Sequence, residues 1–163
     1  MISSSSQSSR YLLVRSIPVW DPREVRPSLS DMLRPSMQTL KHIIVEIHVD
    51  RDDVDPLFDI PFEIENMRTQ NIIESIGIVL KMDRSCRQGN SWGRLDEALT
   101  TPGWFSLKRV SLVIGIVDHG ISHNKLEVAL RKLPETQFPR LSMSNAISFD
   151  FEVYIVSSQY YSA

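Results

Sequence analysis

Cysteine is nearly absent from this sequence. The 163 residues include one, Cys86, which cannot form a disulfide within the chain or supply a thiolate cluster for a metal ion. Proteins that rely on disulfides fold in oxidising compartments. We therefore expect the chain to work in the cytoplasm or the nucleus.

An excess of basic residues and a long apolar run are missing too. Lysine and arginine number 18 against 20 aspartates and glutamates, and the net charge is -2 at pH 7. Nucleic-acid-binding domains normally carry a basic stripe, and a membrane-spanning helix needs about 20 successive apolar residues. The sequence shows neither feature, so we expect no nucleic-acid partner and no membrane partner.

Glycine is scarce, and the phosphate-binding loops that depend on it are missing. The six glycines form neither G-x-G-x-x-G nor a Walker motif. His119 and His123 are four residues apart, but Gly120 lies between them and no further ligands are in view. The acidic run from Asp50 to Asp55 lacks the glycine and the glutamate of a calcium loop. The sequence therefore predicts no cofactor and no metal site.

The first 35 residues are rich in serine and proline. Residues 3–9 are serine except for Gln7, and such a low-complexity segment has nothing to bury. Prolines at positions 18, 22, 27 and 35 disfavour long helices, and the apolar stretch 11–20 is too short and irregular to classify. We expect residues 1–35 to be disordered or irregular and residues 36–163 to form the folded domain.

An internal repeat begins at Leu40. An apolar residue is followed by others three, five and seven positions later, and successive copies start 33 and 34 residues apart (73 − 40 and 107 − 73). The last three positions lie on one face of a strand, so each copy predicts a strand that follows an apolar anchor. The copies are Leu40, Ile43, Val45 and Ile47; Ile73, Ile76, Ile78 and Leu80; Leu107, Val110, Leu112 and Ile114; and a weaker one with Ile147, Phe149, Phe151 and Val153, in which Ile147 is aligned to Val110.

Helices are expected between the later strands. Residues 92–101 have apolar residues at helical spacing, with Ser91 as the N-cap and Pro102 beyond the end. Residues 123–133 follow the same pattern, with Ser122 as the N-cap and Pro134 as the stop. The segment between the first two strands shows no such pattern, and we expect it to be irregular.

Strands that alternate with crossover segments favour a parallel sheet. The fold class is therefore α/β, and the L-x-x-L-x-L core of each copy indicates a short leucine-rich-repeat-like array, in which parallel strands alternate with helices after a disordered N-terminus. A compact α/β sandwich contains the same elements, and periodicity alone does not separate the two folds.

The residues between the core positions form the opposite face of each predicted strand. This face mixes small, apolar and charged side chains, which suits a protein partner better than a phosphate group, and the exposed sheet of a stacked array is its usual binding surface. A solvated face without a partner is the alternative. Alignment of the repeats gives the rows Ile44, Gly77, Ser111 and Ser148; Glu46, Val79, Val113 and Asp150; and His48, Lys81, Gly115 and Glu152. The candidate partner-binding residues are Ile44, Glu46, His48, Val79, Lys81, Ser111, Val113, Asp150 and Glu152.

One catalytic motif occurs. Residues 89–93, Gly-Asn-Ser-Trp-Gly, match the G-x-S-x-G turn of serine hydrolases, in which a strand leads straight into the nucleophile. Asp118 and then His119 or His123 follow Ser91 in the order of a Ser-Asp-His triad. The polar stretch before the motif departs from that context, and a helix N-cap explains Ser91 better. We therefore expect no catalytic residue.

A family resemblance covers residues 36–153. A "W..LD..L..P.F.SL..V" run is similar to one in F-box proteins of mushroom-forming fungi, which then place a helix that ends in a Leu-Pro pair. The resemblance implies a substrate-recognition array of a ubiquitin ligase. The F-box itself is absent from this sequence, so a Skp1-type adaptor is a partner only if an upstream F-box exists. The matching residues are Trp92, Leu95, Asp96, Leu99, Pro102, Phe105, Leu107, Lys108, Val110, Leu133 and Pro134.

The sequence thus predicts a non-catalytic protein–protein interaction module with an unknown protein partner, resembling the substrate-recognition region of an F-box protein without its F-box. Two alternatives stay open. One is a small serine hydrolase that uses Ser91, and the other is a truncated remnant with no independent function, since the terminal repeats of an array need polar caps to be soluble.

Overall fold

The computed structural model describes residues 11–18, 28–49, 55–69, 71–82, 89–118 and 124–157. In this part of the chain five strands form one sheet, whose spatial order is the order of the strands in the sequence. Every neighbouring pair is parallel, which confirms the predicted parallel sheet. The strands are β1 (Tyr11–Pro18), β2 (His42–Val49), β3 (Ser75–Met82), β4 (Arg109–Asp118) and β5 (Ser148–Ser157).

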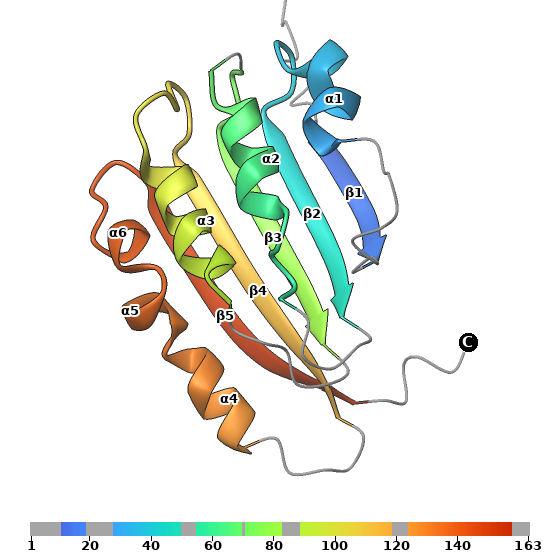
Figure 1. Ribbon diagram of the computed structural model, residues 1–163, viewed down its shortest axis with the longest axis vertical. Helices are drawn as coiled ribbons and strands as arrows, with labels where there is room; N and C mark the ends of the chain where they lie inside the picture. The colour runs from blue at the N-terminus through green and yellow to red at the C-terminus, as the bar shows by residue number, and fades with distance from the viewer. Residues whose placement is uncertain are drawn as a thin grey trace, which may run out of the picture.

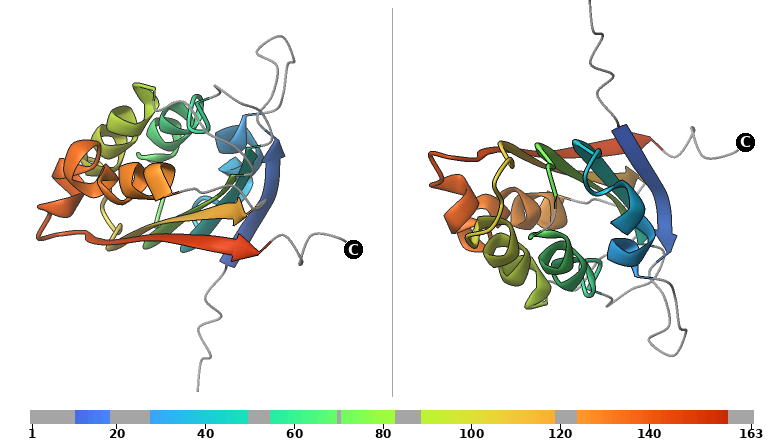
Figure 2. Two further views of the ribbon diagram at one scale, coloured as in Figure 1. Left: turned by 90° about the horizontal axis from the view of Figure 1, so that it is seen from below. Right: turned by 90° about the horizontal axis from the view of Figure 1, so that it is seen from above.

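The helices lie together on one face of the sheet (Figure 1). Views along the sheet show one layer of strands and one layer of helices (Figure 2). Sequential parallel strands with their helices on one face (Figure 1) form stacked strand–helix units, as the predicted array requires. The described helices have at most ten residues, too few to cross a membrane. They are α1 (Leu29–Leu33), the 3₁₀ turn η1 (Arg34–Ser36), α2 (Ile60–Met67), α3 (Ser91–Thr100), α4 (Asn124–Arg131), α5 (Leu133–Thr136) and α6 (Pro139–Ser142).

The apolar positions of the repeat form continuous rows beneath the helices. From β2 to β4 these residues are buried, and each such aliphatic side chain contributes about 1.5–3 kcal/mol to folding. The anchors Leu40, Ile73 and Leu107 are buried as well, as their place in the repeat predicts. The rows are Ile43, Ile76, Val110 and Phe149; Val45, Ile78, Leu112 and Phe151; Ile47, Leu80, Ile114 and Val153; and Val49, Met82, Ile116 and Ile155.

A ladder of hydrogen bonds joins the repeats just before the strands begin. The Lys41 carbonyl accepts from the amides of Glu74 and Ser75, and the Glu74 carbonyl accepts from those of Lys108 and Arg109. The side chains of this ladder alternate in charge, and Glu74 pairs with Lys41 at 2.8 Å and with Lys108 at 3.3 Å. The same repeat position thus fixes the register of adjacent units through backbone and side chain together.

The alignment of the fourth repeat is wrong by two residues. Phe149, and not Ile147, pairs with Val110, an offset of 149 − 110 = 39 residues. Three short helices, α4 to α6, fill the connection between β4 and β5, and this longer crossover breaks the period of 33–34. Ile147 instead lies just before the strand, at the position that Lys108 takes in the previous repeat.

Two helices and one strand lie where the sequence predicted irregular structure. The segment between β2 and β3 contains α2, with Pro61 in the first turn, where its missing amide costs little. β1 and α1 lie within residues 1–35, which the sequence assigned to a disordered or irregular segment. Within that segment, residues 1–10 and 19–27 lie outside the described residues.

The helix ends differ in detail from those predicted. Asn90 is the N-cap of α3, and Ser91 is the first helical residue, so the N-cap prediction for Ser91 is wrong. Pro134 does not stop the last helical segment, because it lies in the first turn of α5, where proline is accommodated. Ser122 lies outside the described residues.

Two buried carboxylates connect neighbouring helices. Asp96 of α3, only 3% exposed, accepts hydrogen bonds from the amides of Arg140 (3.0 Å) and Leu141 (2.9 Å) in the first turn of α6. Glu63 of α2 accepts one from the Ser30 amide of α1 at 2.9 Å and another from the Ser28 hydroxyl at 2.7 Å. Each carboxylate satisfies donors that a helix N-terminus leaves unpaired, so each short helix is fixed to the longer one beside it.

Candidate functional site

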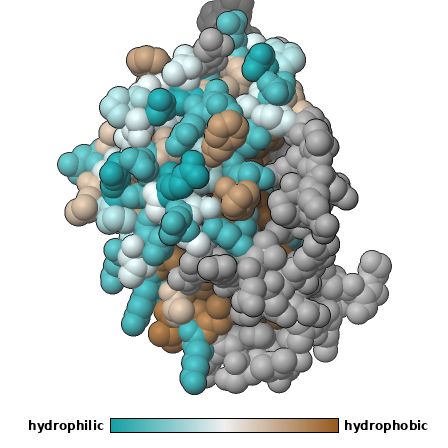
Figure 3. All heavy atoms as spheres, viewed as in Figure 1, coloured by the Kyte–Doolittle hydropathy of each residue, from teal (hydrophilic) through white to brown (hydrophobic). Residues whose placement is uncertain are grey.

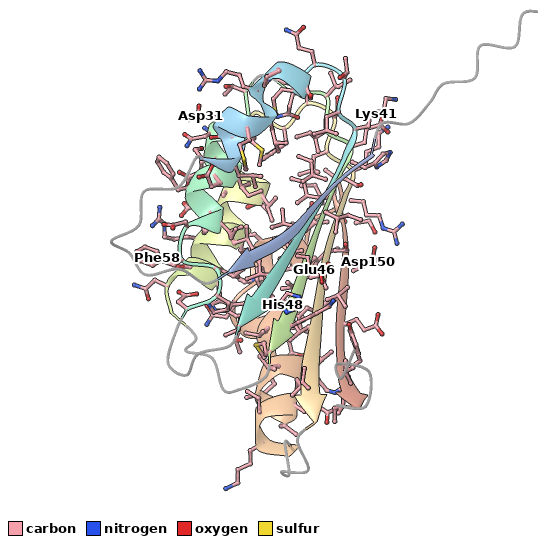
Figure 4. All side chains as sticks on the ribbon, turned by 90° about the vertical axis from the view of Figure 1, so that its right-hand side faces the viewer. Asp31, Lys41, Glu46, His48, Phe58 and Asp150 are labelled. Carbon is pink, nitrogen blue, oxygen red and sulfur yellow. The ribbon has the colours of Figure 1, made fainter. Side chains whose placement is uncertain are left out.

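The face of the sheet opposite the helices, which we call the open face, is covered by no helix of the described residues. In Figure 4 Asp150 lies on this side of the sheet, whereas Phe58 lies on the helical side. The side chains that alternate with the core residues of each strand form it. Its described members are His42, Ile44, Glu46, His48, Ser75, Gly77, Val79, Lys81, Arg109, Ser111, Val113, Gly115, Ser148, Asp150, Glu152 and Tyr154.

All nine candidate partner-binding residues lie on the open face. The rows that they form differ from the predicted ones in β5, because that strand is aligned two residues further along. Asp150 is opposite Ser111, and Glu152 is opposite Val113. Tyr154 therefore completes the row of His48, Lys81 and Gly115, which the sequence alignment had assigned to Glu152.

Glu46 is the centre of a charged cluster on β2 and β3. Its carboxylate accepts a hydrogen bond from the Lys81 ammonium on the neighbouring strand. The His48 Nε2 atom lies 3.2 Å from the same carboxylate oxygen. The hydrogen bond from Lys81, with a smaller contribution from His48, holds the pKa of the Glu46 carboxyl below its ordinary value, against the opposing effect of partial burial. The three side chains are thereby held in fixed positions relative to one another.

Two further cross-strand contacts order the start of the open face. Arg109 of β4 donates through Nε to a carboxylate oxygen of Asp150 on β5 at 2.6 Å. His42 Nδ1 lies 2.8 Å from the Ser75 hydroxyl on β3. With the Glu46 cluster, these contacts distribute positive and negative groups over the face, so that neither sign dominates.

The middle of the open face is apolar and shallow. Ile44 is 38% exposed, and it flanks Gly77, where an added Cβ would lie 3.4 Å from its side chain and 3.1 Å from the Ser111 hydroxyl. At Gly115 an added Cβ would lie 3.0 Å from the end of the Tyr154 ring, so that ring extends across the neighbouring strand. The glycines allow larger side chains to lie low over the sheet. The sequence analysis missed Tyr154, and also Arg109, His42 and Ser75 at the start of the strands. Their alternation with the candidate residues was the available signal.

The G-x-S-x-G motif does not form the turn that its hydrolase counterpart requires. β3 ends at Met82, nine residues before Ser91, whereas a nucleophile elbow joins strand and helix directly. Ser91 is 6% exposed at the start of α3. The other triad candidates are Asp118, at the end of β4, and His119 or His123, which lie outside the described residues.

Among the described residues no group of three or more histidine, cysteine, aspartate or glutamate side chains is placed to hold a metal ion. Asp55, the last member of the acidic run, instead accepts a hydrogen bond from the Leu57 amide at 3.0 Å. It also lies against Gly89, where an added Cβ would clash with its carboxylate. This aspartate therefore closes a turn and packs against the next repeat. Cys86 and the aspartates at positions 50, 52 and 53 lie outside the described residues.

Comparisons with known proteins give no match to a family model, to a curated protein or to a solved structure. The resemblance to F-box proteins thus stays a prediction, and the proposed function is based on the geometry of the open face.

Proposed function

We propose that this chain is a non-catalytic protein–protein interaction module that binds its partner through the open face. The observation that carries this proposal is the fixed arrangement of charged groups around an apolar centre. Lys81 and Arg109 each pair across strands with a carboxylate, one pair on β2 and β3 and the other on β4 and β5. Groups that are already ordered before binding lose less entropy when a partner docks, which favours affinity.

The chemistry of the open face favours a protein over other partners. A phosphate-rich ligand would need clustered positive charge, but Lys81 and Arg109, the lysine and the arginine among the described open-face residues, are each paired with a carboxylate. Tyrosine and arginine are the residue types that most often dominate protein interfaces, and Tyr154 and Arg109 supply both. The described part of the helical face is mostly hydrophilic, with scattered apolar residues and an apolar group toward its lower end (Figure 3).

We extend the proposal to the family resemblance. The chain would be the substrate-recognition region of an F-box-type protein, and its partner the protein presented for ubiquitination. The matching residues in α3 and β4, such as Trp92, Leu99 and Val110, are buried, whereas Phe105 is 86% exposed. The buried residues of the motif therefore account for the packing of one repeat, and the open face alone would determine the partner. A Skp1-type adaptor would bind only through an upstream F-box.

A matched pair of variants tests the proposed surface. Ile44 on the open face and Ile72, which lies before β3, are 38% and 39% exposed, so Ile44→Lys and Ile72→Lys add the same charge at equally accessible positions. We expect wild type and the Ile72 variant to capture the same proteins from a cell extract, and the Ile44 variant to lose them while retaining the wild-type circular dichroism. Equal capture by both variants would place the binding surface elsewhere.

A further inference from the structure

β5 is the last strand of the described sheet, and its outer edge faces no other described strand. Figure 1 shows it at the edge, with α4 and α5 beside it. Its ladder to β4 begins where the Ser148 amide donates to the Lys108 carbonyl at 2.8 Å. Backbone groups alternate in direction along a strand, so the amides and carbonyls of the odd-numbered residues point to the free edge. Such a row is a template for pairing with another strand. Its members are Phe149, Phe151, Val153 and Ile155.

The same edge exposes side chains of the core type. Ile155 continues a core row but is 47% exposed. Val128 of α4 and Met143 after α6 are also exposed, and both helices contact β5. Terminal units of stacked arrays are normally capped by polar residues. This end of the array therefore combines unpaired backbone groups with uncapped apolar side chains.

One carbonyl of the free edge is occupied by a side chain from α4. Arg131 donates through Nη2 to the Val153 carbonyl at 3.2 Å. The same guanidinium donates to the Glu127 carboxylate through Nη2 at 2.7 Å and through Nε at 3.0 Å, which fixes its position over the strand. Val153 lies near the middle of β5, so Arg131 covers the edge at the point where any pairing strand must pass.

We propose that the free edge of β5 is a pairing surface for a second copy of this chain, and that Arg131 keeps it closed in the monomer. The sequence of β5 fits itself in an antiparallel pair with its two-fold axis at Val153. Phe151 of one copy then lies opposite Ile155 of the other, and the two Val153 residues face each other. Aromatic and β-branched residues are favourable cross-strand neighbours. Apolar side chains would thus meet along the core side of the joined sheets.

Repulsion between carboxylates favours the register with its axis at Val153 over its neighbours. With the axis at Val153, Glu152 lies opposite Tyr154 of the other copy and Asp150 lies opposite Val156, so no carboxylate faces another. An axis at Glu152 would place two glutamates directly opposite each other, which is unfavourable. An axis at Tyr154 would shorten the paired stretch. The self-complementarity of the strand is the reason for proposing a second copy and not an unrelated strand.

Arg131 prevents this pairing by competing for a hydrogen bond. In the proposed register each Val153 carbonyl must accept from the Val153 amide of the other copy. That acceptor already binds the guanidinium, which therefore occupies the place of the incoming amide. Removal of Arg131 should therefore open the edge without changing β5 itself.

The experiment is light scattering on size-separated protein over a concentration series. We expect wild type to have the chain mass of 18.7 kDa and Arg131→Ala to show a twofold higher mass. Glu127→Gln removes the ion pair but leaves the contact with β5, and it should stay monomeric. The double variant Arg131→Ala, Ile155→Lys adds a charge to the exposed core row at the edge and should return to the monomer mass.

Three results would overturn the proposal. They are a monomeric Arg131→Ala protein at every concentration, a dimer that persists in the double variant, and a wild-type dimer that Ile155→Lys dissociates, since Arg131 would then close nothing. Circular dichroism checks that each variant is folded. Arg131→Met, which keeps the apolar stem of the side chain but has no donor, repeats the test if the alanine variant folds poorly.

Discussion

Asp96 offers the most direct test of how the helical layer is held together. Replacement by alanine removes both acceptors for the Arg140 and Leu141 amides, which bond to the carboxylate at 3.0 and 2.9 Å. The side chain is almost fully buried, so water cannot replace the lost carboxylate without rearrangement. Hydrogen bonds to charged groups contribute roughly 1.5–3 kcal/mol each. The loss of two should lower the free energy of unfolding by about 3 kcal/mol or more.

This effect is large for a protein of this size, since total stability is typically about 5–15 kcal/mol. In equilibrium unfolding by urea, with a slope of about 2 kcal/mol per molar, the midpoint should fall by about 1.5 M. Asp96→Asn keeps one carbonyl oxygen as an acceptor, so about half of the loss should remain. Both variants should leave the slope unchanged, because the same surface is exposed on unfolding.

The neighbouring residue provides the control. Glu97 is exposed, and its carboxylate lies 3.7 Å from the Arg140 guanidinium on the surface. Exposed ion pairs contribute little, so Glu97→Ala should change stability by less than about 0.5 kcal/mol. If Asp96→Ala were no more destabilising than Glu97→Ala, the two hydrogen bonds to α6 would not stabilise the fold, and the reasoning would be refuted.

Three further predictions concern acid stability, glycine positions and catalysis. Hydrogen bonds from lysines hold the pKa values of Glu46 and Glu74 below 4.5, so their ionised forms stabilise the fold above that pH, and the free energy of unfolding should decrease as the pH falls through the lowered values. Replacing both glutamates by glutamine should make the free energy of unfolding, measured by urea titration at each pH, depend less on pH. An unchanged pH dependence would contradict the stabilising role of the two ionised glutamates. Gly103 has φ = +123°, so Gly103→Ala should lower the free energy of unfolding by roughly 1–3 kcal/mol. Gly93→Ala inside α3, where an added Cβ has its nearest neighbour at 3.8 Å, should raise it by up to about 1 kcal/mol. Thermal melts compare the two variants, and equal effects would contradict the positive φ angle at Gly103. A fluorophosphonate probe should leave the folded protein unlabelled, and labelling that disappears in Ser91→Ala would favour the hydrolase alternative.

The strands β2, β3 and β4 could be predicted because each has one buried and one open face. A period of two in apolar residues then follows directly from the geometry of the strand. β1 could not be predicted, because its own pattern is weak and its register comes from the ladder it forms with β2. The helix α2 was missed because the segment between the first two strands was taken to show no helical pattern, although its buried residues Ile60, Ile64 and Met67 are four and three residues apart.

The nine candidate residues all lie on one face of the sheet even though the alignment of β5 was wrong. A shift by two residues keeps every side chain on its own face of a sheet, whereas a shift by one would reverse it. Asp150 and Glu152 therefore lie on the predicted face but beside different neighbours. The pairing of Arg109 with Asp150 and the position of Tyr154 over Gly115 depend on the true register, which the length of the α4–α6 crossover determines and the repeat period does not reveal.

The central claim is that the open face binds a protein partner, and site-specific photocrosslinking tests it most directly. A photoreactive amino acid is placed at Val113, in the middle of the open face, or at Phe62, which is exposed on α2. Both proteins are incubated with the partner that wild type captures. We predict a crosslink from position 113 and none from position 62. A crosslink from position 62 alone would show that the partner binds the helical face, and would contradict the account.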